Sequence, residues 1–165
     1  MSSHLALWAG VECTVNRIGS RYFNQFDKNG HNKRLGDLEL FASLGIEKIR
    51  YPFLWELAAP DRPDQINWDW ADERMAELRR LNLSPIVGFC HHGSGPQYTS
   101  LLDPEFPEKL AYYALRFAQR FPDITDYTPI NEPLTTARFS GLYGVWYPHH
   151  RQDQSFLFAL YTEVK

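Results

Sequence analysis

The sequence predicts an α/β fold in which parallel strands alternate with helices. Short apolar runs typical of buried strands recur along the 165 residues, and each is followed by a stretch whose apolar residues have helical spacing. No linker, low-complexity segment or close repeat interrupts this order. Strand–helix–strand units of this kind place successive strands parallel, with right-handed crossovers. We therefore expect residues 1–165 to belong to a single domain.

Four apolar runs are predicted to be buried strands. They cover residues 5–11, 46–51, 85–90 and 127–130. Pro52 ends the second run and Pro133 follows the fourth.

Four further segments are predicted to be helices. The first covers residues 34–44. The second begins after Asn67 or Asp69, which are capping residues, and the third begins near Pro107, a residue suited to a first turn. The fourth covers 154–164. Their spaced apolar residues are Leu38, Phe41, Ala42, Ala71, Met75, Leu78, Leu110, Tyr113, Ala114, Phe117, Phe156, Leu157, Leu160 and Tyr161.

The composition excludes several classes of protein. The formal net charge is −3, and the sequence has no cluster of basic residues of the kind that binds nucleic acid. No apolar run reaches the roughly 18 residues of a membrane span, and the apolar segment 5–9 is too short for a signal peptide. Two cysteines make no disulfide framework, which fits a reducing compartment. We expect a cytoplasmic protein that binds neither nucleic acid nor a membrane.

Two architectures fit this alternation, an open doubly wound sheet and a closed barrel. The first strand lacks the glycine-rich turn of a dinucleotide-binding sheet. Instead, polar side chains follow each predicted strand, and chemistry assembled at the carboxyl ends of several strands is typical of a (β/α)8 barrel. A complete barrel needs about 250 residues. We therefore predict a partial TIM (β/α)8 barrel of about the first four βα units. The polar residues are Glu12, Thr14, Asn16, Arg17, Arg50, Glu56, His91, His92, Asn131 and Glu132.

Asn131-Glu132-Pro133 is the sharpest candidate for chemistry. Glycoside hydrolysis requires one protonated carboxylic acid beside the leaving oxygen and a second carboxylate across the sugar. Glu132 suits the first role where burial keeps it protonated, and Asn131 can bind a neighbouring sugar hydroxyl. Pro133 also favours an extended backbone at Glu132. The alternative is that Glu132 is a solvated loop residue.

Three further residues are candidates for binding a sugar. His91 can donate a hydrogen bond to a hydroxyl. Arg50 at a barrel mouth can hold a carboxylate ionised, or else be a surface residue paired with a helix carboxylate. Trp146 and Trp55 can form platforms for a sugar ring.

A metal site made of cysteine and histidine is the remaining alternative at these strand ends. Cys13, Cys90 and His91 occupy comparable positions, but their spacing matches no zinc pattern. We therefore expect neither a metal nor another cofactor.

Several segments, in order, resemble glycoside hydrolase family 1, the β-glucosidase-type barrels. The likeness is greatest to divergent bacterial family-1-like domains and runs from Trp8 to about Pro148. It is carried by residues 8–14, 37–41, 49–51 with Trp55, 89–92 and 128–133, where Thr-Pro-Ile-Asn-Glu-Pro is close to the family's Thr-Phe-Asn-Glu-Pro.

The resemblance implies a retaining enzyme that hydrolyses O-glycosyl bonds, and it implies a role for each matching residue. Glu132 matches the catalytic acid/base and Asn131 the residue that contacts the sugar 2-hydroxyl. His91 matches a histidine of the sugar-binding subsite. Arg50 matches the arginine that contacts the nucleophile.

The sequence also departs from the family. His92-Gly93 replaces a Trp-Asp pair, and the first strand lacks the family's Gln-x-Glu-Gly. The family's nucleophile follows the seventh strand, so we expect it to come from a complementing C-terminal half or from a homo-oligomer. The alternative function is a non-catalytic carbohydrate-binding or scaffold protein.

Overall fold

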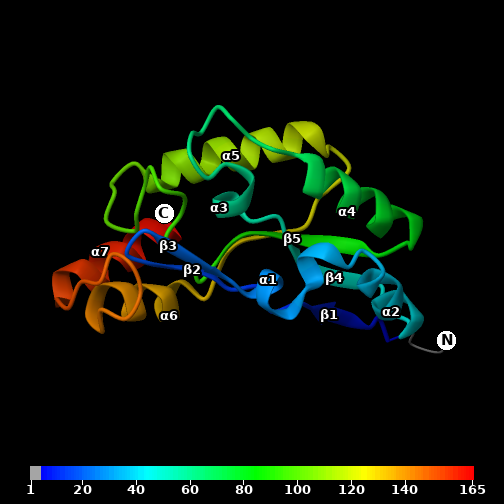
Figure 1. Cartoon of the computed structure of the whole chain (residues 1–165), viewed down its shortest axis with the longest axis horizontal. Helices are drawn as coiled ribbons and strands as arrows, with labels where there is room; N and C mark the ends of the chain where they lie inside the picture. Colours follow the sequence, from blue (N-terminus) through cyan, green and yellow to red (C-terminus); the bar gives the residue numbers. More distant parts are fainter. Residues whose placement is uncertain (1–4) are drawn as a thin grey trace.

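A four-stranded parallel sheet forms the centre of the computed structural model, which describes residues 5–165 (Figure 1). Its strands are β1 (Trp8–Gly10), β4 (Lys48–Pro52), β5 (Ser84–His91) and β6 (Tyr127–Asn131). They lie in the order β1-β4-β5-β6, and every neighbouring pair is parallel. The predicted alternation of parallel strands and helices is therefore confirmed.

Helices connect the strands, and α4 and α5 lie side by side along one face of the sheet (Figure 1). This is the geometry that successive right-handed βα units produce. The four long helices are α2 (Asp37–Ser43), α4 (Asp69–Arg80), α5 (Phe106–Arg120) and α7 (Asp153–Val164). The short ones are α1 (Gln25–Asn29), η1 (His31–Lys33), α3 (Trp55–Ala58), α6 (Pro133–Ala137) and the π-helix η2 (Arg138–Leu142).

An antiparallel hairpin follows β1 and was not predicted. It consists of β2 (Val15–Ile18) and β3 (Arg21–Asn24), and Ile18 pairs with Arg21 across a two-residue turn. Gly19 begins this turn with a φ of 60°, a left-handed conformation that glycine adopts readily. The hairpin extends from the carboxyl end of β1, so it helps to build the rim of the sheet.

The ends of the strands differ from the prediction in two places. The first strand covers only Trp8–Gly10 rather than 5–11, and Leu5 and Leu7 before it are exposed. β4 includes Pro52, but only as its last residue. Proline lacks a backbone N–H, and at the end of a strand this removes no hydrogen bond from the interior of the sheet.

Aromatic side chains fill the layer between the sheet and helices α4 and α5. Phe53 and Phe89 both pack against Phe117, with ring centroids 5.0 and 5.3 Å apart. Trp68 stacks on Tyr113 with an interplanar angle of 10°. Each buried aromatic side chain removes a large apolar area from water, so this layer is a major source of stability.

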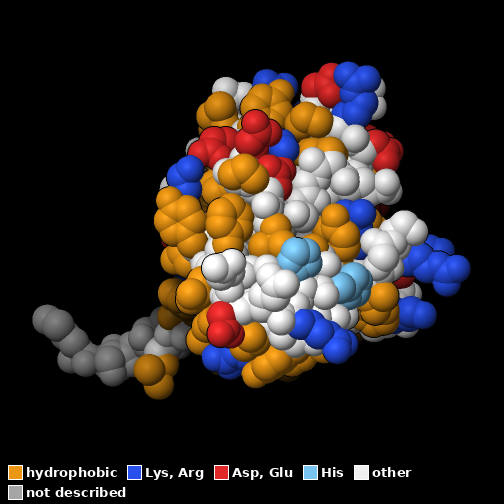
Figure 2. All heavy atoms as spheres, turned by 90° about the vertical axis from the view of Figure 1, so that its left-hand side faces the viewer, with side chains coloured by type: hydrophobic (Ala, Val, Ile, Leu, Met, Phe, Trp, Pro, Cys, Tyr) orange, Lys and Arg blue, Asp and Glu red, His pale blue; other side chains and the backbone are white. Residues whose placement is uncertain are grey.

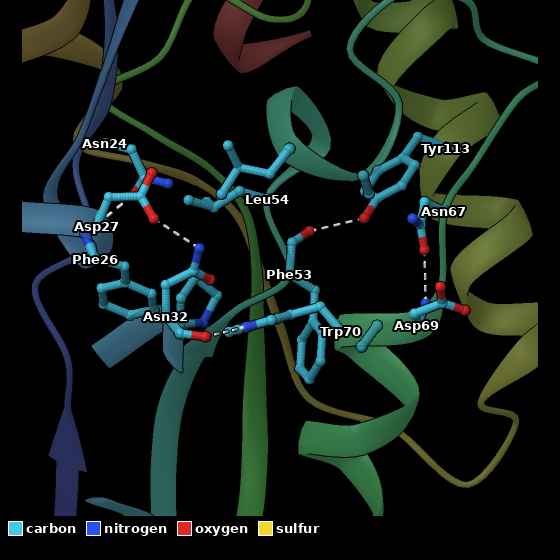
Figure 3. A pocket seen from close by; sticks show the side chains of 14 residues that line it. Asn24, Phe26, Asp27, Asn32, Phe53, Leu54, Asn67, Asp69, Trp70 and Tyr113 are labelled. Carbon is cyan, nitrogen blue, oxygen red and sulfur yellow. Dashed lines mark hydrogen bonds between the residues drawn. The ribbon is translucent and has the colours of Figure 1, made fainter. Parts of the chain in front are cut away.

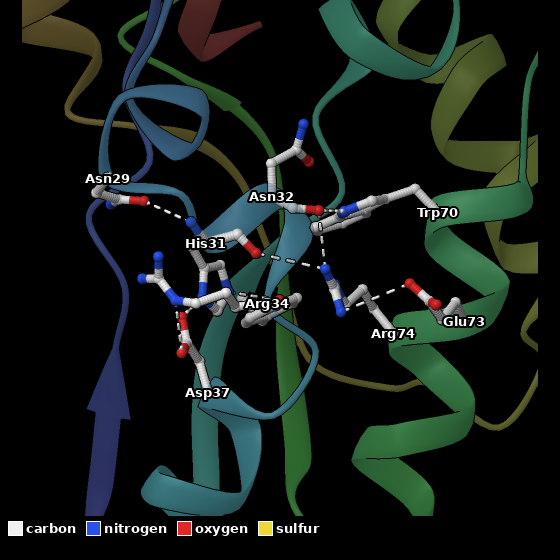
Figure 4. Close-up of polar contacts among 9 residues, drawn as sticks. Asn29, His31, Asn32, Arg34, Asp37, Trp70, Glu73 and Arg74 are labelled. Carbon is white, nitrogen blue, oxygen red and sulfur yellow. Dashed lines mark hydrogen bonds and ion pairs between the residues drawn. The ribbon is translucent and has the colours of Figure 1, made fainter.

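A polar network ties the segment before α2 to β4 and α4 (Figure 4). The two ring nitrogens of His31 lie 2.8 Å from Asp37 Oδ2 and 2.8 Å from the hydroxyl of Tyr51. The buried Arg74 donates to the carbonyl of Asn32 at 2.9 Å. These bonds pair polar groups that would otherwise be buried without partners.

Strands β1 and β6 form the two edges of the four-stranded sheet. The sheet is open in the described chain, and its carboxyl ends all face the same side. Over residues 5–165, no helix has both the length and the apolar character needed to cross a lipid bilayer.

Candidate functional site

The predicted site residues meet at the carboxyl ends of the parallel strands. Arg50 lies on β4, while His91 and Asn131 are the last residues of β5 and β6 and are register partners. Glu12 follows β1 and Glu132 follows β6. The hairpin β2–β3 and helix α6 lie on the same side in Figure 1. Parallel topology is what brings these distant segments together.

His91 and Glu12 form the tightest contact in the site. His91 is buried, and its Nε2 lies 2.8 Å from Glu12 Oε1. Partial burial opposes ionisation of Glu12, but the charge and hydrogen bond of His91 hold the Glu12 pKa below its usual value. Burial lowers the pKa of His91 and outweighs the opposite effect of Glu12. Near neutral pH, the pair is therefore a carboxylate that accepts a hydrogen bond from a neutral imidazole.

His92 completes a second part of the network. Asn131 Nδ2 lies 3.2 Å from His92 Nε2, and His92 Nδ1 lies 3.2 Å from Thr136 Oγ1 on α6. One set of directions satisfies both bonds: Asn131 donates to Nε2, and Nδ1–H donates to Thr136. Burial lowers the pKa of His92 as well, which favours this neutral form. The ring of Trp146 lies 5.4 Å from that of His92, so the predicted platform borders the site.

Glu132 occupies the sharp turn between β6 and α6. Its φ of 47° and ψ of 62° are left-handed, so the expectation of an extended backbone was wrong. The reason is geometric: α6 begins at the next residue, and the carbonyl of Glu132 accepts from the amide of Thr136. Its Oε2 lies 4.0 Å from His92 Nε2, and its side chain is 60% exposed. The expected burial of this carboxyl group is therefore absent.

Arg50 borders a small hollow beside His91 and Asn131. It is half-buried, and among residues 5–165 no carboxylate pairs with it. Its positive charge disfavours protonation of both histidines of the site. The alternative that Arg50 pairs with a helix carboxylate on the surface is therefore wrong.

Glu56 supports the loop after β5 from beneath. Its Oε1 accepts hydrogen bonds from the amide of Gly95 at 3.2 Å and from Cys90 Sγ at 3.4 Å. Burial raises the pKa of Glu56 to about 7. Cys13 and Cys90 are free and buried. Cys90 is thus engaged with Glu56 rather than with the histidines.

Trp55 is not a sugar platform. It is completely buried, and its Nε1 donates to the hydroxyl of Tyr98 at 2.9 Å. Its ring packs against Phe106 with centroids 5.5 Å apart. The earlier expectation was wrong because Trp55 begins α3, which is packed beneath α5 rather than at the rim.

An apolar cavity lies away from this site (Figure 3). It has a volume of about 370 Å³ and is lined by Phe26, Leu54, Trp70 and Tyr113, among others. The hydroxyl of Tyr113 donates a hydrogen bond to the carbonyl of Phe53 at 2.9 Å. None of the predicted site residues lines this cavity, so it offers no part of the chemistry described above.

Comparison with known proteins identifies the relatives of this chain. It is 28% identical over 130 residues to the probable inactive β-glucosidase 14 of Oryza sativa subsp. japonica, and 24% identical over 133 residues to β-glucosidase 2 of the same plant. The family 1 β-glucosidase of Thermotoga maritima has a similar fold, with a TM-score of 0.70 over 80% of this chain and 22% identity. The AHE enzyme of Alicyclobacillus herbarius gives 0.72 with 23% identity. No family model matches the sequence.

The chain resembles plant β-glucosidases in sequence and a family 1 β-glucosidase in fold. It covers 25% and 27% of the length of the two curated relatives and 32% of the solved structures. The parallel sheet and helices of this β-glucosidase-like chain correspond to part of a barrel of that type.

Sequence reasoning found most but not all of the site in this β-glucosidase-like chain. The structure brings Arg50, His91, Asn131 and Glu132 to one edge of the sheet. It also adds Thr136, which sequence reasoning missed. The signal for Thr136 was weak, because a threonine one turn into a helix is common. Its hydrogen-bond partner can be identified only in the folded structure.

Proposed function

We propose that residues 1–165 are the N-terminal half of a retaining glycosidase barrel that acts on O-glycosyl bonds. In this proposal, Glu132 is the acid/base, Asn131 and His91 bind the sugar, and Trp146 borders its ring. The observation that carries the proposal is the position of Glu132, at the carboxyl end of β6 beside Asn131 and 4.0 Å from His92. Arg50, which has no carboxylate partner within residues 5–165, is available to a nucleophile.

The nucleophile is proposed to come from a complementing C-terminal half or from a homo-oligomer. A retaining mechanism needs a second carboxyl group about 5–5.5 Å from the acid/base. Figure 2 shows the end of the molecule that carries α6 and α7, where hydrophobic side chains gather on the surface. Leu157, Tyr161 and Val164 of α7 are 59%, 63% and 66% exposed, and this apolar surface favours association. The free, buried state of Cys13 and Cys90 is consistent with a cytoplasmic location.

The test is hydrolysis of an aryl β-glucoside by the chain alone and in an equimolar mixture with the C-terminal half of a family 1 barrel. We expect turnover in the mixture and a loss of about 100-fold or more in Glu132→Gln. Glu105→Gln is the matched control, since Glu105 is 74% exposed on another part of the surface. Turnover that persists in Glu132→Gln contradicts the assignment.

Carbohydrate binding without turnover is the second candidate. The exposure of the Glu132 side chain favours it, because an acid that must stay protonated is normally shielded from water. Calorimetric titration with a β-glucoside distinguishes the two functions. Binding that is equal in the unmodified chain and in Glu132→Gln, with no turnover in any mixture, supports the second.

A further inference from the structure

We propose that Glu12, His91 and His92 form a binding site for a divalent metal ion of the zinc type. One carboxylate oxygen of Glu12 and one ring nitrogen of each histidine lie within 4.8 Å of one another. Two imidazoles and one carboxylate are a ligand set that zinc uses in proteins, and imidazole nitrogens disfavour Mg²⁺ and Ca²⁺. The inference goes beyond the proposed function and does not depend on it.

The Nε2 atoms of both histidines lie next to the same group, the side-chain amide of Asn131, which an ion bound between them would displace. Asn131 Nδ2 lies 3.3 Å from His91 Nε2 and 3.2 Å from His92 Nε2. Glu12 Oε1 lies 2.8 Å from His91 Nε2. Ligand atoms bound to one tetrahedral zinc ion are about 3.3 Å apart, so small side-chain rotations suffice to gather these three atoms around an ion.

The hydrogen bonds around His92 prepare it to be a ligand. Its Nδ1–H is directed to Thr136 Oγ1, which leaves a lone pair on Nε2 facing Asn131 and His91. Metal-binding histidines are commonly oriented by such a bond from the second ring nitrogen. At His91, the ion would replace the proton now shared between Nε2 and Glu12.

The backbone at His92 is bent in a way that serves this arrangement. Its φ of 58° is left-handed, a conformation that is uncommon for a residue with a side chain. The next residue is Gly93, where a Cβ atom would overlap Glu56 Oε1. The loop can therefore turn tightly over Glu56 and hold the His92 ring against Asn131. Sparsely populated backbone conformations of this kind gather at functional sites.

The site is open on one side. The side chain of His91 is buried, at 6% exposure, and that of His92 is partly buried, at 12%, whereas that of Glu12 is 61% exposed. Three protein ligands and an open side leave a coordination position for water or for a hydroxyl group of a ligand. The carboxylate of Glu132 lies 4.0 Å from His92 Nε2, on the exposed side of the cluster's second histidine.

The test is titration of tag-free, chelator-treated protein with Zn²⁺ by calorimetry and with Co²⁺ by visible absorption. We expect one ion per chain, with affinity about 100-fold lower in His92→Gln and Glu12→Gln. His150→Gln is the matched control, because His150 is exposed and bonded to Ser155 rather than to the cluster. Absence of stoichiometric binding, or equal binding by all four proteins, overturns the proposal.

A second measurement guards against misfolding of the variants. Paramagnetic shifts induced by Co²⁺ in the unmodified chain should be largest for the ring protons of His91 and His92. Shifts centred on another group overturn the site even when the variants cannot be purified. Glycoside binding is measured separately without metal, so failure of the metal site and failure of the proposed function are distinguishable.

Discussion

The carboxyl group of Glu56 lies directly against the backbone of Gly93, and a Cβ atom at position 93 would overlap Glu56 Oε1. The loop that carries His92 is therefore shaped by a residue of the preceding βα unit. The same carboxyl group also accepts the amide of Gly95, so the turn is held at two points.

Gly93→Ala is expected to destabilise the protein by about 1–3 kcal/mol, because the added methyl group must displace a fully packed side chain. Gly36→Ala is the control, since no atom lies within 4 Å of a Cβ built at that position. Denaturant unfolding compares the two free energies. Equal stabilities for both variants would show that Glu56 moves aside without cost.

Glu163→Gln is expected to change how stability depends on pH. Glu163 is buried on α7, its carboxyl oxygens have no hydrogen-bond partner among the described residues, and burial raises its pKa to about 9. The folded state therefore holds a proton that the unfolded state releases near the ordinary glutamate pKa of 4.5. The stability from this proton is complete below about pH 4.5 and is lost as the pH rises to about 9.

The variant should thus match the unmodified chain at pH 4.5 and exceed it at pH 8, with a difference that grows by up to about 1.4 kcal/mol per pH unit. Thermal and chemical unfolding at several pH values measures this difference. Glu105→Gln, on the exposed start of α5, should show no such trend. A constant difference at all pH values would contradict the assigned protonation of Glu163.

Tyr51→Phe is expected to lower the free energy of unfolding by about 1–2 kcal/mol. The hydroxyl of Tyr51 lies 2.8 Å from His31 Nε2 in a buried position, so its removal leaves a polar atom without a partner. Tyr161→Phe is the control, because Tyr161 is 63% exposed. Similar effects in the two variants would indicate that water replaces the lost hydroxyl.

Trp146→Ala is expected to weaken binding of a β-glucoside by about tenfold, the equivalent of roughly 1.4 kcal/mol for a lost aromatic contact. Trp8→Ala is the control, since Trp8 is exposed at the start of β1, at the opposite end of that strand from the site. Calorimetric titration measures both dissociation constants. Unchanged binding in Trp146→Ala would remove this residue from the proposed sugar site.

The order of strands and helices could be predicted because each buried parallel strand is a contiguous apolar run. β2 and β3 were missed because their residues alternate irregularly in polarity, although the Gly19-Ser20 turn was an available signal. The gathering of Arg50, His91 and Asn131 followed from topology alone. The direction of each side chain, and the left-handed turn at Glu132, depend on contacts that single-sequence patterns do not contain.

Helix α7 shows a further limit of such patterns. Its apolar residues, Leu157 and Tyr161 among them, predicted the helix, but both are largely exposed, whereas Thr162 and Glu163 are buried. Helical periodicity locates a face without showing which neighbour covers it. In the described chain, the covered face is the more polar one.

The free edges of β1 and β6 limit what can complete the sheet. Three inter-strand steps of about 4.8 Å separate them, or roughly 14 Å measured across the sheet. One added strand can satisfy the backbone groups of only one edge and would leave the other unpaired. A partner that pairs with both edges must itself be a curved sheet of several strands. Closing the sheet into a barrel therefore requires a multi-stranded partner rather than a single peptide.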